Sequence, residues 1–387
     1  MQAYCGLKAL SRLFPQAHVE IIDYRPGRLR WTEYRKLLGR RAPFFKLATF
    51  RKILSIQRFV NEHLAVSPER CETDNLRKAT SFINSQDYDV IFVGSDTVWE
   101  ARKSSYVPLA PNVYYLPEVE GPLKVAYAAS ADPKQPVFIE SEKTISAVSA
   151  AIKSFDLITV RDQATREYLE MLGLPAEEIH FIPDPTFQYD FSSLVQHPRV
   201  DKVRPWAAVG FNGAASVGIA KQLREKGFDI VNLSKWTLNE KPIPGAEASL
   251  HVRLGVFSML DFMVTDRFHS SIFTMKLARA PMLVFVESAQ KWRNMDSKGR
   301  DLFTRLGMER MVWRYEGGNA PDDLVERYMC IWDQVGGVLK NNLATLERLA
   351  LRQLEWVSEQ VSLNIQSHKV ADHSNLFSSA NGGVQNV

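Results

Sequence analysis

The sequence predicts an α/β protein made of two lobes, each with a parallel sheet covered by helices. Three observations lead to this prediction. A chain of 387 residues is long enough for two domains, at roughly 150 residues each. Short β-branched runs alternate with helical patterns along most of the chain, which is typical of parallel sheets. This alternation stops in an irregular segment near the middle of the chain and then begins again.

The first lobe is expected over residues 1–195 and begins with an amphipathic helix. Residues 47–85 are helical and mixed, and buried strands then alternate with helices. The predicted strands are Val19–Asp23, Val90–Gly94, Lys124–Ser130, Leu157–Val160 and Ile179–Ile182. The predicted helices are Ser141–Lys153 and Asp162–Leu172, and the second ends at Gly173 with Pro175 beyond it.

The second lobe is expected over residues 196–335, after a linker at Tyr189–Pro205 that shows no periodicity. Its predicted strands are Trp206–Phe211, Phe228–Leu233, Asp261–Thr265 and Met282–Val286. Helices are expected at Ser216–Lys226 and Ser270–Leu277. Because ligands of such folds bind beyond the carboxyl ends of the strands, we expect the site in the cleft between the lobes.

Two helical stretches follow Met311–Tyr315, and the second predicts an amphipathic helix over residues 336–365. Leucines at 339, 343, 346 and 354 and valines at 357 and 361 share one face of it. This face predicts docking against the lobes, with dimerisation and contact with a membrane surface as alternatives. The polar residues 366–387 predict a disordered tail.

The composition excludes several classes of protein. The net charge of +4 is too small for a protein that mainly neutralises a phosphate backbone, so no nucleic-acid partner is expected. Cys5, Cys71 and Cys330 form no CxxC pair, which excludes a zinc ribbon and fits a reducing cytoplasm. The first residues do not resemble a signal peptide, and no stretch approaches the roughly 20 apolar residues of a membrane span. We therefore expect a cytoplasmic protein.

The strongest candidate site follows the strand that ends near Asp266. Arg267 and His269 lie two residues apart, so an extended chain turns both side chains to the same side. Ser270 or Ser271 can cap the next helix, whose first amides point back toward this loop. A fixed cation, a titratable imidazole and backbone donors together form a receptor for an anion with a proton donor beside it. The alternative is an ion-paired Arg267 and a packed His269.

Further candidates lie at strand ends in the first lobe. Arg161 stands where a strand meets a helix, and it is equally compatible with a structural ion pair and with ligand binding. Gly94 permits a tight turn, after which Ser95 or Asp96 can cap a helix or bind a hydroxyl. Trp99 is expected in the core, with stacking on a sugar face as the alternative.

Two other candidates are a proline turn and a glycine-containing loop. Asp184 lies between two prolines after a strand, and Asn212 lies in the Gly210–Gly213 loop that opens the second lobe. This loop lacks the spacing of a dinucleotide fingerprint. No His, Asp or Glu cluster has the spacing of metal ligands, so we expect no metal.

Taken together, these segments resemble the polysaccharide pyruvyl transferase family. The matching stretches are DVIFVGSDTVWE, VAYAAS, ITVRDQATREYLEMLG, IPDPTF and MVTDRFHSSIFTMKLARAPMLVF, in family order from about residue 85 to residue 286. The opening QAY, LKAL and VEIIDYRP also resemble the first helix and second strand of the family. No single motif is unique, but the ordered set is specific.

The resemblance implies a fold similar to the GT-B glycosyltransferases and phosphoenolpyruvate as donor, with no other cofactor. Family members transfer the pyruvyl unit to two hydroxyls of one sugar and form a cyclic ketal. By similarity, Arg161, Arg267 and Phe268 are expected to bind the donor, the two arginines taking its carboxylate and phosphate in either order. His269 is expected to donate or shuttle the proton, and Asp266 to orient or charge-balance this pair. The expected partner is a glycan or lipid-linked oligosaccharide acceptor.

One departure from the family concerns the start of the chain. Relatives usually have a strand and a Gly/Asn-rich turn before the QAY helix, whereas Met1 directly precedes Gln2 here. We therefore expect the first lobe to lack its first strand, which would expose a hydrophobic edge. Either the start codon is assigned too late or the chain is truncated. Two alternative functions follow, a nucleotide-sugar-dependent glycosyltransferase of the same architecture and an inactive truncated paralogue.

A basic segment occupies Arg25–Lys52. It contains ten Lys or Arg residues and one acid, Glu33, interleaved with aromatic residues. A solvated helical face or a lid is the simpler interpretation. The alternative is peripheral contact with an anionic bilayer that carries a lipid-linked acceptor.

Overall fold

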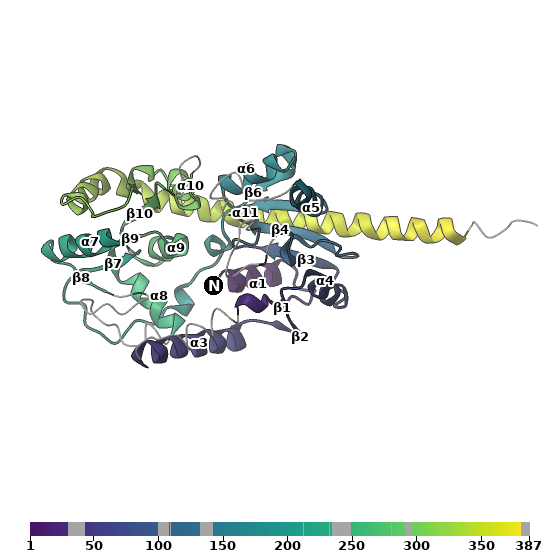
Figure 1. Ribbon diagram of the computed structural model, residues 1–387, viewed down its shortest axis with the longest axis horizontal. Helices are drawn as coiled ribbons and strands as arrows, with labels where there is room; N and C mark the ends of the chain where they lie inside the picture. The colour runs from purple at the N-terminus through teal and green to yellow at the C-terminus, as the bar shows by residue number, and fades with distance from the viewer. Residues whose placement is uncertain are drawn as a thin grey trace, which may run out of the picture.

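The computed structural model describes residues 1–29, 43–99, 108, 110–131, 142–211, 213–231, 233, 249–279, 281–290 and 296–380. Two α/β lobes lie side by side, and one long helix runs along both of them (Figure 1). The strands of each lobe pair only with strands of the same lobe. The change of lobe falls between Phe181 and Trp206, a range that contains the linker predicted from the sequence.

The N-terminal lobe contains two parallel sheets. Strands β1 (Ile21–Arg25) and β2 (Val66–Glu72) form one pair, and β3 (Val90–Gly94), β4 (Leu123–Ala129), β5 (Leu157–Val160) and β6 (Ile179–Phe181) form the other sheet in that order. Within the described residues no strand pairing joins the two sheets. Among the described residues the strands of this lobe therefore form two separate sheets.

Helices cover both faces of the four-stranded sheet. On one face lie α4 (Leu76–Asn84), α5 (Glu142–Lys153) and α6 (Gln163–Met171), whose apolar side chains share a core with the sheet. On the other face, Ala9 of α1 (Gln2–Leu13) packs with Tyr127 and with part of the C-terminal helix. Helix α3 (Pro43–His63) reaches the other lobe, because Phe59 and His63 contact His251 there.

The C-terminal lobe has one parallel sheet of five strands in the order β11-β10-β9-β7-β8. The strands are β7 (Trp206–Gly210), β8 (Asp229–Ile230), β9 (Leu260–Thr265), β10 (Met282–Ser288) and β11 (Val312–Tyr315). The helices are α7 (Ala214–Glu225), α8 (Leu250–Ser258), α9 (Phe268–Leu277) and α10 (Lys298–Arg305). Short 3₁₀ turns are η1 (Val113–Tyr115), η2 (Ala176–Glu178), η3 (Pro185–Gln188), η4 (Ser192–Leu194) and η5 (Glu309–Met311). Both lobes thus have the parallel, helix-covered sheets of a Rossmann-like fold, as predicted.

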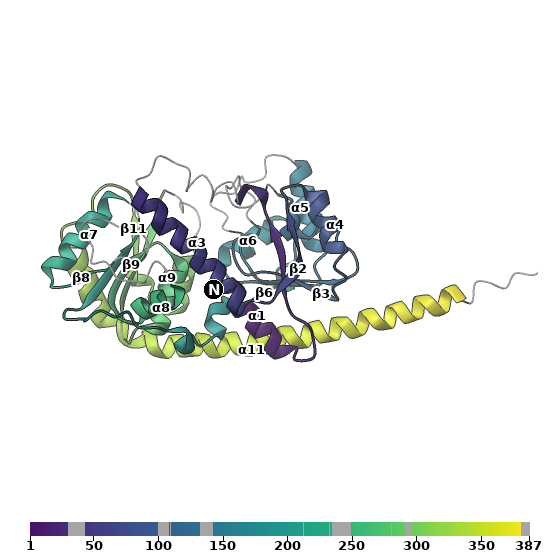
Figure 2. The ribbon, with the colours of Figure 1, turned by 90° about the horizontal axis from the view of Figure 1, so that it is seen from below.

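The long helix α11 spans Leu324–Ala380 and extends past the N-terminal lobe (Figure 2). Its first part packs in the core of the C-terminal lobe through Leu339 and Leu346. Farther along, Leu354 and Val357 pack against the N-terminal lobe. The prediction that this apolar face docks on the lobes is therefore confirmed, because both lobes bury it.

The boundaries of the C-terminal segment differ from the prediction. We expected a helix over residues 336–365 and a disordered tail from 366, whereas one helix runs from Leu324 to Ala380. Two glycines, Gly336 and Gly337, lie inside this helix at the start of the segment that we predicted. Gly336 lies beneath the ring of Trp332, where an added Cβ would come within 2.5 Å of the indole. The small residue therefore permits this contact inside a continuous helix.

Among the described residues, no helix has both the length and the hydropathy that crossing a membrane requires.

Candidate functional site

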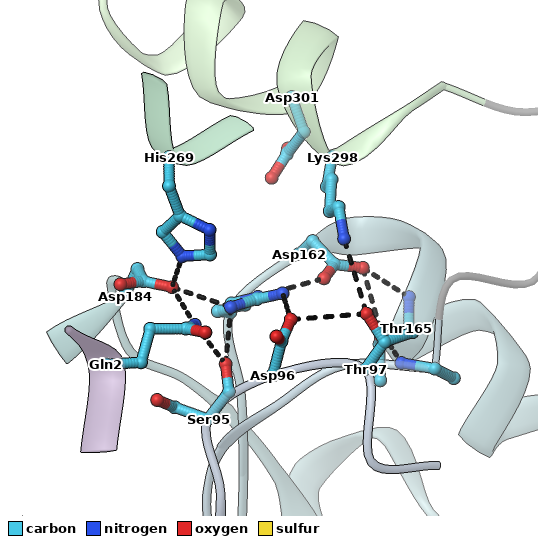
Figure 3. Close-up of polar contacts among 12 residues, drawn as sticks. Gln2, Ser95, Asp96, Thr97, Asp162, Thr165, Asp184, His269, Lys298 and Asp301 are labelled. Atoms are coloured by element: carbon cyan, nitrogen blue, oxygen red, sulfur yellow. Dashed lines mark hydrogen bonds and ion pairs between the residues drawn. The ribbon is translucent and has the colours of Figure 1, made fainter. Parts of the chain in front are cut away.

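The candidate residues meet where the carboxyl ends of strands from both lobes face each other (Figure 3). Ser95 and Asp96 follow β3, Arg161 follows β5 and Asp184 follows β6, all in the N-terminal lobe. His269 comes from the other lobe, in the first turn of α9 after β9. The parallel strand order therefore gathers residues that lie up to 174 positions apart in the sequence, from Ser95 to His269.

Arg161 is the central cation of this cluster. Its side chain is 0% exposed, and its Nη1 donates to Asp184 Oδ2 at 2.6 Å and to the carbonyl oxygen of Ser95. Its Nη2 lies 3.3 Å from Asp96 Oδ1, and its Nε lies 3.9 Å from Asp162 Oδ2. Burial lowers the pKa of Arg161, but the surrounding carboxylates outweigh burial and hold this pKa above its usual value.

These contacts limit what Arg161 can bind. An incoming anion would meet one guanidinium already surrounded by three carboxylates, so one of the ion pairs would have to open first. Donor binding through Arg161 therefore stays a prediction. Through these ion pairs Arg161 also holds the carboxylates of Asp184 and Asp96 in place.

Asp184 is the most constrained carboxylate of the site. Its Oδ2 accepts from Arg161 and from Gln2 Nε2 at 2.9 Å, and its Oδ1 accepts from the amide and the hydroxyl of Thr186 at 3.0 and 2.6 Å. His269 Nε2 lies 3.4 Å from the same Oδ2. Burial raises the pKa of this carboxyl, but His269 and Arg161 outweigh burial and hold the pKa well below its usual range. Asp184 is therefore ionised at neutral pH.

His269 lies at the lobe interface with 30% of its side chain exposed. Its Nε2 is buried and makes no well-aligned hydrogen bond with any residue that the structure describes. The nearest charged group to that nitrogen is Asp184. Figure 3 shows the other ring nitrogen turned toward the side where Lys298 lies. One ring nitrogen thus meets the N-terminal lobe, and the other points toward the side of Lys298.

Phe268 and Lys298 complete the C-terminal side of the site. The Phe268 ring lies 5.2 Å from the Arg161 guanidinium carbon and 5.9 Å from Lys298 Nζ, so cations stand near it from both lobes. Lys298 Nζ also donates to Thr97 Oγ1 at 3.4 Å across the lobe interface. The sequence interpretation missed Lys298. The signal was Ser297, which caps α10 and so places Lys298 in its first turn.

Arg267 has a different environment from Arg161. Its side chain is 64% exposed, and its Nε lies 3.1 Å from Asp266 Oδ1, which agrees with the expected charge-balancing contact of Asp266. Arg267 is also the N-cap residue of α9, and its side chain makes no capping bond. The first amides of α9 therefore lack a side-chain cap, which leaves donors at the end of a helix where anions are favoured.

Three further candidate residues remain to be placed. The core position expected for Trp99 is confirmed, because its side chain is 0% exposed and packs with Tyr115 and Phe155, and the alternative of a cleft residue is wrong. Ser95 contributes its backbone carbonyl to the site, accepting from Arg161 and Gln2, rather than a free hydroxyl. Asn212 lies outside the described residues.

The charges divide the site into two sides. Three carboxylates around one guanidinium leave the N-terminal side acidic, and Asp96 is the exposed member at 64% of its side chain. On the C-terminal side, Lys298 and the uncapped start of α9 favour anions, whereas Arg267 is paired with Asp266 and the carboxylate of Asp301 also lies on this side (Figure 3). Burial raises the pKa of Asp96, but Arg161, Lys298 and His269 together lower it. Across the described residues, no group of three or more His, Cys, Asp or Glu side chains is arranged to hold a metal ion.

The sequence model of a family described as polysaccharide pyruvyl transferase matches residues 1–280. Among solved structures, Anabaena HepE in complex with UDP is similar with a TM-score of 0.47 and 10% identity, over 90% of this chain and 100% of that one. HepE with UDP and glucose gives 0.47 and 11% identity, and HepE with UDP-glucose gives 0.44 and 11%, with the same coverage. No curated protein matches the sequence.

Proposed function

The chain belongs to the polysaccharide pyruvyl transferase family, and we propose that it transfers the pyruvyl group of phosphoenolpyruvate to two hydroxyls of one sugar. The product is a cyclic ketal on a polysaccharide or lipid-linked glycan. One observation supports this proposal most strongly. His269, on the C-terminal side, meets the buried Asp184 of the acidic N-terminal side. A proton donor thus stands between a surface suited to anions and a surface suited to hydroxyls.

The chemistry requires one proton donor and no change of oxidation state. Protonation of the methylene carbon of phosphoenolpyruvate makes the adjacent carbon cationic, and a sugar hydroxyl attacks it. Phosphate then leaves, and the second hydroxyl closes the ring. Of the two hydroxyl protons, one balances the proton now on the methyl group and the other leaves with phosphate. An imidazolium at His269 can supply the first proton and recover one from a hydroxyl.

The donor fits the C-terminal side because its carboxylate and phosphate need cations. Lys298 offers one positive charge, Arg267 offers a second once the anion displaces Asp266 from it, and the uncapped start of α9 offers backbone amides. Phe268 lies between the two lobes and can pack against the three-carbon unit. The acidic N-terminal side would repel the donor, which is a further reason to assign the donor to the other lobe.

The acceptor fits the N-terminal side for the opposite reason. A sugar hydroxyl donates well to a carboxylate, and Asp96 is the exposed carboxylate beside the cluster. Thr97, next along the chain, already reaches across the interface to Lys298. We therefore propose that the sugar binds against Asp96 and Thr97 while its two hydroxyls face His269.

A lipid-linked acceptor would bring the enzyme to a membrane, and helix α3 offers a surface for it. Phe50, Leu54 and Ile56 are 50%, 46% and 54% exposed on this helix. Arg51 and Arg58 are exposed beside them. Exposed apolar residues flanked by basic ones are typical of helices that bind anionic bilayers. Most of the basic segment Arg25–Lys52 predicted from the sequence lies outside the residues with described side chains.

The test is a pyruvylation assay with phosphoenolpyruvate and a panel of methyl glycosides, in which phosphate release and the mass of a pyruvate ketal are measured. His269→Ala should abolish the product while phosphoenolpyruvate still raises the melting temperature. His18→Ala is the matched control, because His18 is 80% exposed at the surface. Consumption of a nucleotide sugar, with no ketal from phosphoenolpyruvate, would instead establish a glycosyltransferase. Full activity of His269→Ala would remove His269 from the mechanism.

A further inference from the structure

Asp184 is a buried carboxylate whose hydrogen-bonding capacity is filled by residues of its own lobe. Arg161, Gln2 and Thr186 already supply four donor contacts, and the carboxylate is 0% exposed. These donors fix both oxygens, so the carboxylate cannot rotate without breaking several bonds. Its position is therefore set before any group from the other lobe reaches it.

His269 is the one member of this group that comes from the C-terminal lobe. The other donors belong to the N-terminal lobe: Arg161 follows β5, Gln2 begins α1 and Thr186 lies in η3. His269 belongs to α9. Its Nε2 is buried and has no well-aligned hydrogen-bond partner among the described residues. Asp184 Oδ2 lies 3.4 Å away, at the long end of the hydrogen-bond range, so a small shift of the lobes that aligns and shortens this contact would turn it into a hydrogen bond. Such contacts are often long in the absence of substrate and shorten in the reactive complex.

We propose that Asp184 is a positioning residue that acts through His269, and that docking of the two lobes is what brings the two together. Asp184 accepts a proton-bearing Nε2, so Nδ1 becomes the atom that exchanges a proton with the substrate. Figure 3 agrees with this assignment, because the second ring nitrogen faces the side of Lys298. With the lobes apart, His269 lacks its partner, and proton transfer is therefore coupled to closure. This inference rests on the proposed pyruvyl transfer.

The proton balance follows from this arrangement. Imidazolium Nδ1–H gives its proton to the methylene carbon of the donor, and neutral Nδ1 takes a proton from an attacking hydroxyl. Nε2 keeps its proton throughout, held by Asp184. Asp184 itself stays ionised, because the charges around it hold its pKa well below the usual range of a carboxyl. The same logic orients the imidazole in hydrolytic triads, where the carboxylate fixes the tautomer and takes no proton.

The activity arm of the experiment compares Asp184→Asn with Asp162→Asn. Asp162 is an equally buried carboxylate near the same arginine, with its Oδ2 3.9 Å from Arg161 Nε. An asparagine there can still cap α6. We expect Asp184→Asn to lower kcat by about 10²–10⁴-fold with little change in KM, and Asp162→Asn to lower it by less than about 10-fold.

The second arm does not depend on turnover. Protein labelled with ¹³C and ¹⁵N in histidine reports the tautomer of each ring, and His269→Gln assigns the signal of His269. The wild-type protein should show His269 protonated at Nε2, and Asp184→Asn should shift it toward a mixture of tautomers. If Asp184→Asn does not fold, Thr186→Val loosens the same carboxylate by removing one donor at 2.6 Å, and the wild-type spectrum remains informative.

The outcomes separate the two proposals. If the wild-type enzyme makes no ketal, the proposed function is contradicted. If its His269 is nevertheless protonated at Nε2, and Asp184→Asn disturbs this tautomer, the positioning role is supported. An active enzyme contradicts the positioning role if Asp184→Asn keeps its kcat. A wild-type His269 protonated at Nδ1 overturns the inference whatever the activity.

Discussion

Replacing the buried Arg161 tests whether its ion pairs hold the N-terminal lobe together. Arg161→Met keeps an unbranched side chain of similar length but removes the charge. It leaves Asp184 fully buried without its guanidinium, which lies 2.6 Å away in the wild type. Breaking a buried pair by removal of one partner costs about 3–5 kcal/mol of unfolding free energy. Since Thr186 and Gln2 still donate to Asp184, we expect the lower end, about 3 kcal/mol.

The assay is equilibrium unfolding by denaturant, followed by circular dichroism, with a thermal melt beside it. For a lobe of this size, 1 kcal/mol shifts the melting temperature by about 2–4 °C, so we expect a decrease of about 6–12 °C. Arg166→Met is the matched control, because Arg166 pairs with Glu170 at 3.0 Å on the surface of α6. A partly exposed pair of this kind contributes at most about 1 kcal/mol.

A double variant sharpens the test. Arg161→Met combined with Asp184→Asn removes the unpaired charge, and a neutral amide costs less to bury than a carboxylate. The pair should therefore lose less stability than the sum of the two single variants. A loss below about 1 kcal/mol for Arg161→Met alone, or a loss equal to that of Arg166→Met, would refute the claim that this ion pair is structural.

Three other predictions concern donor binding, stability at acidic pH and membrane binding. Lys298→Ala should raise KM for phosphoenolpyruvate by about 10-fold or more in steady-state kinetics, with a smaller effect on kcat, because a charge-assisted contact is lost. Asp184 has a lowered pKa in the folded state, so the stability it contributes is present above the unfolded pKa of about 3.9 and is lost as pH falls below it. Denaturant midpoints at pH 7, 4 and 3 should decrease in that order, and less steeply in Arg161→Met. Replacing Arg51 and Arg58 by Glu should reduce flotation with phosphatidylglycerol vesicles by about 10-fold or more, because each basic charge near the membrane contributes about 1 kcal/mol. Vesicles of pure phosphatidylcholine should bind neither the wild type nor the variant. Unchanged flotation would exclude α3 as the contact.

The regular elements of the fold were predictable from the sequence. The four-residue strand β5 was predicted with its observed bounds, because a short apolar run between turn residues has few other interpretations. Strand β2 was missed, since Pro68 and charged residues weaken its pattern, and its pairing with β1 depends on a distant segment. Periodicity reports how one element faces its surroundings and not which neighbour it meets.

The site was predictable in its parts and not in its contacts. Asp184 and His269 were both placed at strand ends, and the parallel topology made their approach plausible. The surroundings of Arg161 were not predictable, because they depend on loops that follow three different strands. Trp99 shows the same limit, since an indole beside a loop suits a sugar as well as a core, and only packing distinguishes the two.

Helix α11 affects the order in which the protein can mature during synthesis. The N-terminal lobe is synthesised before the C-terminal lobe, but Leu354, Val357 and Val361, which pack on one face of its sheet, are made only after the strands of the C-terminal lobe. Helix α1 can cover part of that face from the start, but the part that α11 covers stays exposed while the C-terminal lobe is being synthesised. A nascent chain in this state exposes apolar surface to chaperones and to other nascent chains, and completion of one helix shields it.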